Sequence, residues 1–173
     1  MKIIFQSFAK YNRVVNQEIL NIVELMPKEK IFEKSKAYYP AIFDTLSHIF
    51  NTDIAWLRRY KAAMPENKAL AGSLLLGLDK DALKKEIEED YKKLFKFRKE
   101  TDETIFQFAE ELDADKMDRI IKFTNNRGEQ VEKELWKLLL QWFNHQTHHR
   151  GQISIQLDML GVMNDYSSML NKI

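Results

Sequence analysis

The spacing of apolar residues along the chain predicts several long helices. Between residues 4 and 26 an apolar side chain recurs every three or four positions, which places these side chains on one face of a helix. The apolar positions of this first helix are Ile4, Phe8, Tyr11, Val15, Ile19, Ile22 and Met26. Pro27 ends it, because proline supplies no amide hydrogen and restricts the backbone of the residue before it.

The same periodicity predicts two further helices with a loop between them. The second helix covers residues 39–61, with a proline in its first turn, and residues 64–77 form a loop with one proline and two glycines. The third helix covers residues 79–108 and begins at Asp79, which suits an N-cap. Its exposed face is supported by acid-before-base pairs at a spacing of four, namely Asp81–Lys85, Glu88–Lys92 and Glu89–Lys93.

Residues 119–132 show a different pattern, which is typical of a short hairpin turning at Gly128. A two-stranded ribbon alone is marginally stable, so we expect it to pack on the helices. A last helix runs from about Glu132 to Leu160, and Gly161 ends it. The chain is therefore predicted to be a single all-α domain, residues 1–173, folded as a four-helix bundle with a short β-hairpin before the last helix.

Composition narrows the range of functions. The 173 residues carry 27 basic and 26 acidic side chains, a formal net charge of +1, so we expect no nucleic-acid partner. No apolar run approaches the ~18 residues of a membrane span and no secretory signal is visible, so we expect no membrane partner and a soluble, cytoplasmic protein. The absence of cysteine excludes thiolate nucleophiles and Cys-ligated metals within the chain, and directs attention to the four histidines.

His145 and His149 form a candidate metal-binding pair on the last helix. A residue four positions on lies about 40° around the helix and one turn along, so both imidazoles share a face and can offer nitrogens to one ion at ~2.0–2.1 Å. The spacing is similar to that in zinc proteases, but Gln146 stands where their base glutamate belongs, which disfavours peptide hydrolysis. A hydrogen-bonded polar cluster without metal is the alternative. His148 points elsewhere and is expected to pack or to lie exposed.

A third ligand has to come from another helix, and His48 on the second helix is the candidate. Its neighbours on the helical wheel are small or polar: Ala41, Thr45, Thr52 and Ala55. These neighbours are compatible with an exposed histidine or with a polar cavity into which His48 reaches.

Five further residues are weaker candidates. Gln152 and Gln156 share the face of the two histidines and are able to hold water or substrate, or to make ordinary polar contacts. Arg150 points about 140° away from His145, which favours bracing the helix or a subunit contact. Tyr11 and Trp142 suit either a pocket wall or the core. No general base emerges, so the catalytic residues are left unknown.

The stretch 143–153, FNHQTHHRGQI, resembles the signature helix of the DinB/YfiT-like superfamily. The resemblance continues in the first helix at residues 11–13 (YNR) with Asn16, and in the second helix at residues 46–49 (LSHI), the place of that family's helix-2 metal histidine. It implies a four-helix bundle with a divalent metal at one end. Zinc and nickel suit such a site, with iron, manganese, cobalt or copper as alternatives. The ligands implied by the resemblance are His48, His145 and His149.

The resemblance also implies a function. Three neutral imidazoles leave the charge of a dication uncompensated, so water or an anion should complete the site, where the metal lowers the pKa of a bound water or thiol. Related proteins include thiol-dependent transferases, so we expect an enzyme acting on a small molecule with a low-molecular-weight thiol as cosubstrate, or else a hydrolase. The alternative is a non-catalytic bundle whose metal has a structural, sensing or stress-response role.

The reverse side of the last helix is apolar as well, at Trp136, Leu140, Phe143 and Ile155. A helix that is apolar on two sides is either deeply buried or shares one side with a partner. Since homodimers are common among similar proteins, we expect a homodimer built on an isologous contact of this helix.

Overall fold

The computed structural model describes residues 1–125 and 127–173, and the described part is mostly helical. Its long helices are α1 (Lys2–Leu25), α3 (Ile42–Ala63), α6 (Lys92–Glu110) and α7 (Leu135–Met159). The shorter elements between them are α2 (Lys28–Ile31), α4 (Lys68–Gly72), α5 (Lys80–Glu89), the 3-10 turn η1 (Ala114–Lys116), β1 (Ile120–Thr124) and β2 (Gln130–Glu134). The predicted all-α bundle with a hairpin before the last helix is confirmed.

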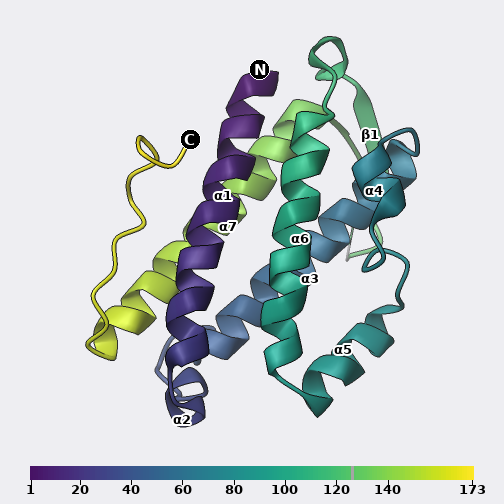
Figure 1. Ribbon diagram of the computed structural model, residues 1–173. Coiled ribbons are helices and arrows are strands. Elements are labelled where there is room, and N and C mark those ends of the chain that lie inside the picture. The colour runs from purple at the N-terminus through teal and green to yellow at the C-terminus, as the bar shows by residue number, and fades with distance from the viewer. Residues whose placement is uncertain (126) are drawn as a thin grey trace.

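The four long helices form a ring in which α1 and α3 each pack against both α6 and α7 (Figure 1). Residue numbers rise on α3 as they fall on α7, from the hydrogen-bonded pair Thr45–Gln156 to the pair Asp53–Trp142, so these two helices are antiparallel. The segment after α7 returns alongside α1, where the Tyr11 hydroxyl donates to one of its backbone carbonyls. Of the described helices, none is long and apolar enough to cross a membrane.

The hairpin sets the start of α7. Strand β1 pairs antiparallel with β2, with Ile120 opposite Glu134. Gly128 in the turn has a φ of +80°, a conformation that favours glycine. Because β2 extends to Glu134, α7 begins at Leu135 rather than near residue 132, where the apolar periodicity placed it.

The predicted third helix is wrong at its middle, where the structure has two helices. Asp90 is extended, with φ −145° and ψ 102°, and its carboxylate accepts a hydrogen bond from the Lys92 amide at 3.0 Å. An aspartate side chain that binds the first amide of the following helix offers the backbone an alternative to a continuous helix. The acidic last turn of α5 also faces the negative end of the helix dipole. Glu88 accordingly pairs with Lys84 at 3.6 Å, instead of with Lys92 across the break.

The predicted loop over residues 64–77 contains a short helix, α4. The Asn67 side chain accepts a hydrogen bond from the Leu70 amide at 3.0 Å, and the Glu111 carboxylate accepts one from the Lys68 amide at 2.7 Å. Both contacts satisfy first-turn amides that have no partner within the helix. A helix of five residues is too short to show an apolar periodicity, which is why the sequence pattern did not predict it.

Single residues on two helices depart from where the apolar pattern placed them. On α1, Ile4 is 52% exposed whereas Asn12 and Asn16 are buried. On α7, Phe143 is buried and stacks on Phe8 with ring centroids 5.5 Å apart, so it is unavailable to a dimer partner. The interior therefore holds polar side chains as well as apolar ones.

Candidate metal centre

Three histidine side chains from two antiparallel helices meet between α3 and α7. His48 lies in the second turn of α3, and His145 and His149 lie one turn apart on α7. The Nε2 of His145 is 3.0 Å from the Nε2 of His48 and 3.0 Å from the Nε2 of His149. One ring nitrogen of each residue lies within 4.8 Å of the other two. The structure thus brings together the three residues that the sequence analysis singled out.

Hydrogen bonds hold the outer nitrogens of two of these rings. The Nδ1 of His48 is 2.7 Å from the Tyr39 hydroxyl, and the two rings stack. The Nδ1 of His149 is 2.6 Å from Gln152 Oε1, which can only accept, so this nitrogen carries the proton. The Nε2 of His149 then directs a lone pair toward the centre. The Nδ1 of His145 is buried and has no hydrogen-bond partner in the described part of the chain.

The surroundings favour the neutral form of all three imidazoles. Burial, and then the neighbouring histidines, lower the pKa of His145 to about 4. Burial also lowers the pKa of His48, and His149 adds to the effect. The pKa of His149 is lowered mainly by burial, against the opposing effect of its hydrogen bond to Gln152. A neutral imidazole offers the lone pair that a metal ion requires.

The arrangement fits a divalent metal ion. Two nitrogens 3.0 Å apart can both reach an ion at ~2.0–2.1 Å, because their separation is smaller than the sum of two such bonds. Without an ion, a single proton on the His145 Nε2 can form a hydrogen bond with the Nε2 of His48 or of His149, but not with both at once. A metal ion uses all three lone pairs together, and Tyr39 and Gln152 would fix the orientation of two ligand rings.

The centre is open to solvent and has no negative charge of its own. His48 and His145 are only half-buried. Among the described residues, the side chains hydrogen-bonded to the three imidazoles are neutral, namely Tyr39 and Gln152. A bound dication would therefore keep most of its charge for a further ligand.

His148 lies outside this centre, as its direction on the helix predicted. It is exposed, and its Nε2 is 3.2 Å from the Nε2 of Gln152. It is therefore not placed to join the three converging nitrogens.

Gln156 supports the centre indirectly. Its Oε1 accepts a hydrogen bond from the Thr45 hydroxyl at 3.0 Å, and its Nε2 donates to the Tyr39 carbonyl at 2.9 Å. It thereby holds the residue that contacts His48. The sequence analysis missed Tyr39, because it precedes α3 and its contact with His48 depends on the fold of the loop before that helix.

The other residues nominated from the sequence belong to the core. Trp142 is fully buried and donates to Asp53 at 2.6 Å. Arg150 is buried, donates to Thr147 at 3.0 Å and lies over the Tyr11 ring at 5.0 Å. Arg150 therefore braces the interior, and the alternative of a subunit contact through it is wrong.

Behind the histidines, Asp53 is the centre of a second polar group. It is fully buried, and its carboxylate accepts hydrogen bonds from Trp142 at 2.6 Å, Gln146 at 3.1 Å and Arg98 at 2.5 Å. Gln146 directly follows His145 in the sequence, and its side chain points inward to Asp53. It leaves no side chain at the place where a zinc protease carries its base.

Arg98 extends this group across the bundle. It also donates to Asp102 at 2.7 Å, and Asn16 donates to the same carboxylate at 2.8 Å. Burial acts to lower the pKa of Arg98, but the two aspartates raise it above its ordinary value, so the guanidinium keeps its charge. We call this set the buried polar layer; it draws on all four long helices and consists of Asn16, Asp53, Arg98, Asp102 and Gln146.

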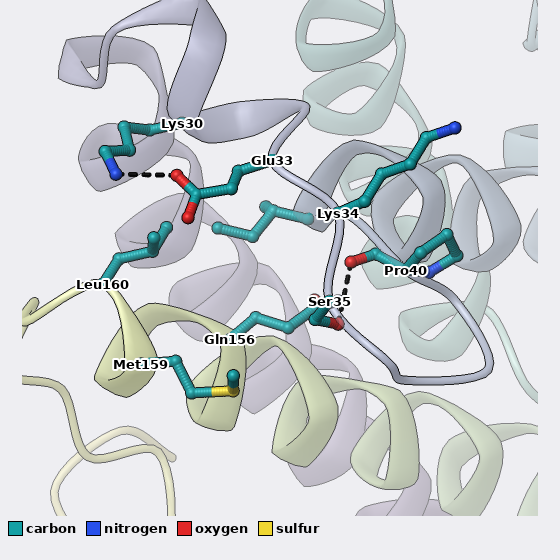
Figure 2. Close-up of a pocket in the computed structure, with 9 residues that line it drawn as sticks. Lys30, Glu33, Lys34, Ser35, Pro40, Gln156, Met159 and Leu160 are labelled. Carbon is teal, nitrogen blue, oxygen red and sulfur yellow. Dashed lines mark hydrogen bonds and ion pairs between the residues drawn. The ribbon is translucent and has the colours of Figure 1, made fainter.

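A separate cavity lies beside the loop that precedes α3 (Figure 2). Its volume is about 100 Å³, and Gln156 lines it but none of the three histidines does. Lys30 and Glu33 in its wall pair with each other at 2.6 Å, and the Ser35 hydroxyl donates to the Pro40 carbonyl at 2.9 Å. Because these polar groups satisfy one another, the histidine centre is the stronger candidate for chemistry.

Comparison with known sequences identifies the family. The model of the DinB family matches residues 1–169. The chain belongs to the DinB family. Protein DinB of Bacillus subtilis (strain 168) is similar to this DinB-family chain, with 29% identity over 154 residues that cover 88% of this chain and 83% of that protein. No solved structure gives a significant match. DinB-family membership and the three-histidine group are both compatible with a metal-binding protein.

Proposed function

We propose that this DinB-family chain is a metal-dependent enzyme that transfers a low-molecular-weight thiol to a small electrophilic substrate. His48, His145 and His149 would hold the ion, and zinc or nickel is the expected metal because imidazole suits both. The observation that carries the proposal is the convergence of three Nε2 atoms on one point, with two of the rings fixed from behind by Tyr39 and Gln152.

When bound, the ion supplies a Lewis acid that lowers the pKa of a coordinated thiol or water. The protein's part is to orient the imidazoles and to leave the positive charge uncompensated, which favours an anionic ligand such as a thiolate. Because the chain has no cysteine, the thiol has to come from a second substrate. Burial, and then Tyr38, raise the pKa of Tyr39, so its hydroxyl stays protonated and keeps its hydrogen bond to His48 at neutral pH.

Transfer is favoured over hydrolysis by the absence of a nearby base. Gln146 is turned to Asp53, and no carboxylate is hydrogen-bonded to the three imidazoles in the described part of the chain. A general base that accepts the proton of an attacking water typically contributes about 10²–10⁴-fold to the rate, and the centre lacks that contribution. A thiol needs less help, because its own pKa is far lower than that of water.

Metal analysis of the untagged protein tests the centre. Wild-type protein should retain about one divalent ion per chain. His48→Ala and His149→Ala should each lose most of it, whereas the matched control His148→Ala should keep it. Unchanged metal content in both ligand variants would overturn the proposed site.

A thiol-consumption assay then tests the reaction. Protein loaded with zinc or nickel is mixed with glutathione, cysteine or coenzyme A and the electrophile monochlorobimane. We expect metal-dependent loss of thiol that His48→Ala abolishes. A protein that binds the metal but consumes none of these thiols would contradict the enzyme proposal and favour a structural or stress-response role.

We also propose that the chain forms a homodimer through the outer face of α7. Leu140 and Ile155 on this face are 47% and 61% exposed. An isologous contact between two copies would cover both residues. Sedimentation should therefore show a dimer at micromolar concentration, and Leu140→Lys with Ile155→Lys should convert it to a monomer. A wild-type monomer at that concentration would contradict this proposal.

A further inference from the structure

A basic cavity begins at His48 and extends along α3. Its volume is about 430 Å³, which falls within the range of pockets that hold small organic molecules. The wall is formed by α3 and the start of α5. The lining residues that matter for its chemistry are His48, Thr52, Ala55, Arg58, Arg59 and Lys80.

Small side chains leave room for a ligand beside His48. Thr52 and Ala55 follow His48 by four and seven residues, so they lie on the same face of α3. From His48 to Arg58 the helix rises by about 15 Å, part of which an arginine side chain can span. A ligand that touches both ends of the cavity is therefore an elongated molecule and not a single small ion.

The cavity carries three cations and no carboxylate in its wall, namely Arg58, Arg59 and Lys80. Arg58 donates to the backbone carbonyl that precedes the cap of α5, which fixes its position. In the part of the chain that the structure describes, neither Arg58 nor Lys80 forms an ion pair. Asp79 is the acidic group facing Arg58 from α5, and its carboxylate already caps that helix by accepting a first-turn amide at 2.9 Å.

Aromatic rings hold the third cation. The guanidinium of Arg59 lies 4.8 Å from the ring centroid of Trp56 and 4.7 Å from that of Phe123. These cation–π contacts hold its guanidinium at the cavity wall. The positive end of the cavity is thus built by residues from α3, α5 and β1.

We propose that this cavity is a subsite for an oxyanion, a carboxylate or phosphate, at the far end of the thiol substrate. The inference rests on the proposed function: the cavity shares His48 with the metal centre, so a thiol held by the ion there would extend along α3 toward the cations. Arginine binds an oxyanion through two parallel hydrogen bonds, and lysine adds a point charge. An anionic thiol of suitable length therefore binds more tightly than a neutral thiol of the same length.

A pair of probes that differ only at the far end tests the subsite. Cobalt(II)-loaded protein is titrated with 6-mercaptohexanoate and with 6-mercaptohexanol, and binding is followed by the sulfur-to-cobalt charge-transfer absorption. We expect the acid to bind about tenfold more tightly than the alcohol, which corresponds to about 1.4 kcal/mol. The shorter 3-mercaptopropionate should show a smaller advantage over its alcohol, since its carboxylate does not reach Arg58. Comparison with 6-mercaptohexyl phosphate shows which oxyanion the subsite prefers.

Variants assign the effect to the cations. Arg58→Gln and Lys80→Gln should remove most of the advantage of the acid, while the exposed Lys84→Gln on α5 serves as the matched control and should keep it. Equal Kd values for the acid and the alcohol in wild-type protein would overturn the subsite and leave the metal centre standing. A cobalt-loaded protein that shows no charge-transfer band with any thiol would contradict the proposed function, and the subsite with it.

Discussion

Two polar groups lie next to each other inside the bundle, the buried polar layer and the histidine centre, and they differ in how their charges are balanced. In the buried polar layer, Asp53 and Arg98 face each other at 2.5 Å, and three donors surround the Asp53 carboxylate. In the histidine centre, three neutral imidazoles converge, and in the described part of the chain no carboxylate is hydrogen-bonded to them. Incomplete hydrogen bonding does not separate the two groups, because Arg98 Nε, Gln146 Oε1 and His145 Nδ1 are all buried without a partner among the described residues. What marks the centre as a site for an external ligand is that its imidazole lone pairs converge and the described residues supply no cation between them, whereas the layer pairs its charges within the chain.

The largest expected effect is the loss of Asp53. Asp53→Ala leaves the Arg98 charge buried with one carboxylate fewer and removes the acceptor of Trp142 and Gln146. Removing one partner of a buried ion pair costs about 3–5 kcal/mol, so the free energy of unfolding of the metal-free protein should fall by that amount in urea titrations. The exposed Asp118→Ala should change it by less than about 0.5 kcal/mol. A loss below about 1 kcal/mol for Asp53→Ala would contradict a stabilising role for the Asp53–Arg98 ion pair.

The metal should produce the next largest effect, and only through the histidine centre. Free zinc at about a thousandfold excess over its Kd should raise the free energy of unfolding by about 4 kcal/mol. His145→Ala should remove this increment, because its Nε2 is the atom that both other histidines approach at 3.0 Å. Unfolding curves with and without a chelator measure it. An equal increment in His145→Ala would place the metal elsewhere in the chain.

A smaller effect should follow from the residue that orients His48. Tyr39→Phe removes the hydroxyl 2.7 Å from the His48 Nδ1 and keeps the stacked ring. Loss of such a supporting hydrogen bond lowers metal affinity about 10–100-fold, which competition with a chelating dye measures. Tyr38→Phe is the matched control, since this neighbour is 88% exposed and should leave the affinity unchanged. An unchanged affinity in Tyr39→Phe would mean that the bundle alone orients the imidazole.

The sequence predicted the parts of the fold that depend on local spacing. The long helices, the hairpin at Gly128 and the shared face of His145 and His149 all follow from periodicity or turn chemistry. The break at Asp90 was not predicted, because the apolar stripe continues from α5 into α6 and conceals the change of helix direction. His48 was placed by resemblance to a family, since spacing alone left it either exposed or in a cavity.

The buried polar layer could have been predicted from its positions. Asp53 stands between Phe50 and Leu57 on the apolar arc of α3, and Asn16 occupies a core position of α1. A charged residue at a core position of one helix calls for a partner at a core position of another, here Arg98 on α6. Which partner it meets depends on the packing of the helices, and no single-helix pattern contains that information.

The smallest expected effect concerns His148, which borders the histidine centre, and it tests whether three or four histidines bind the metal. The His148 ring meets the His149 ring edge to face, with centroids 4.9 Å apart, yet His148 is exposed and its Nε2 lies beside Gln152, away from the three converging nitrogens. His148→Ala should therefore leave the metal content unchanged and alter the free energy of unfolding by less than about 0.5 kcal/mol. Loss of metal in this variant would make His148 a fourth protein ligand. A centre closed by four histidines has no position for a thiol, and its metal would then be structural.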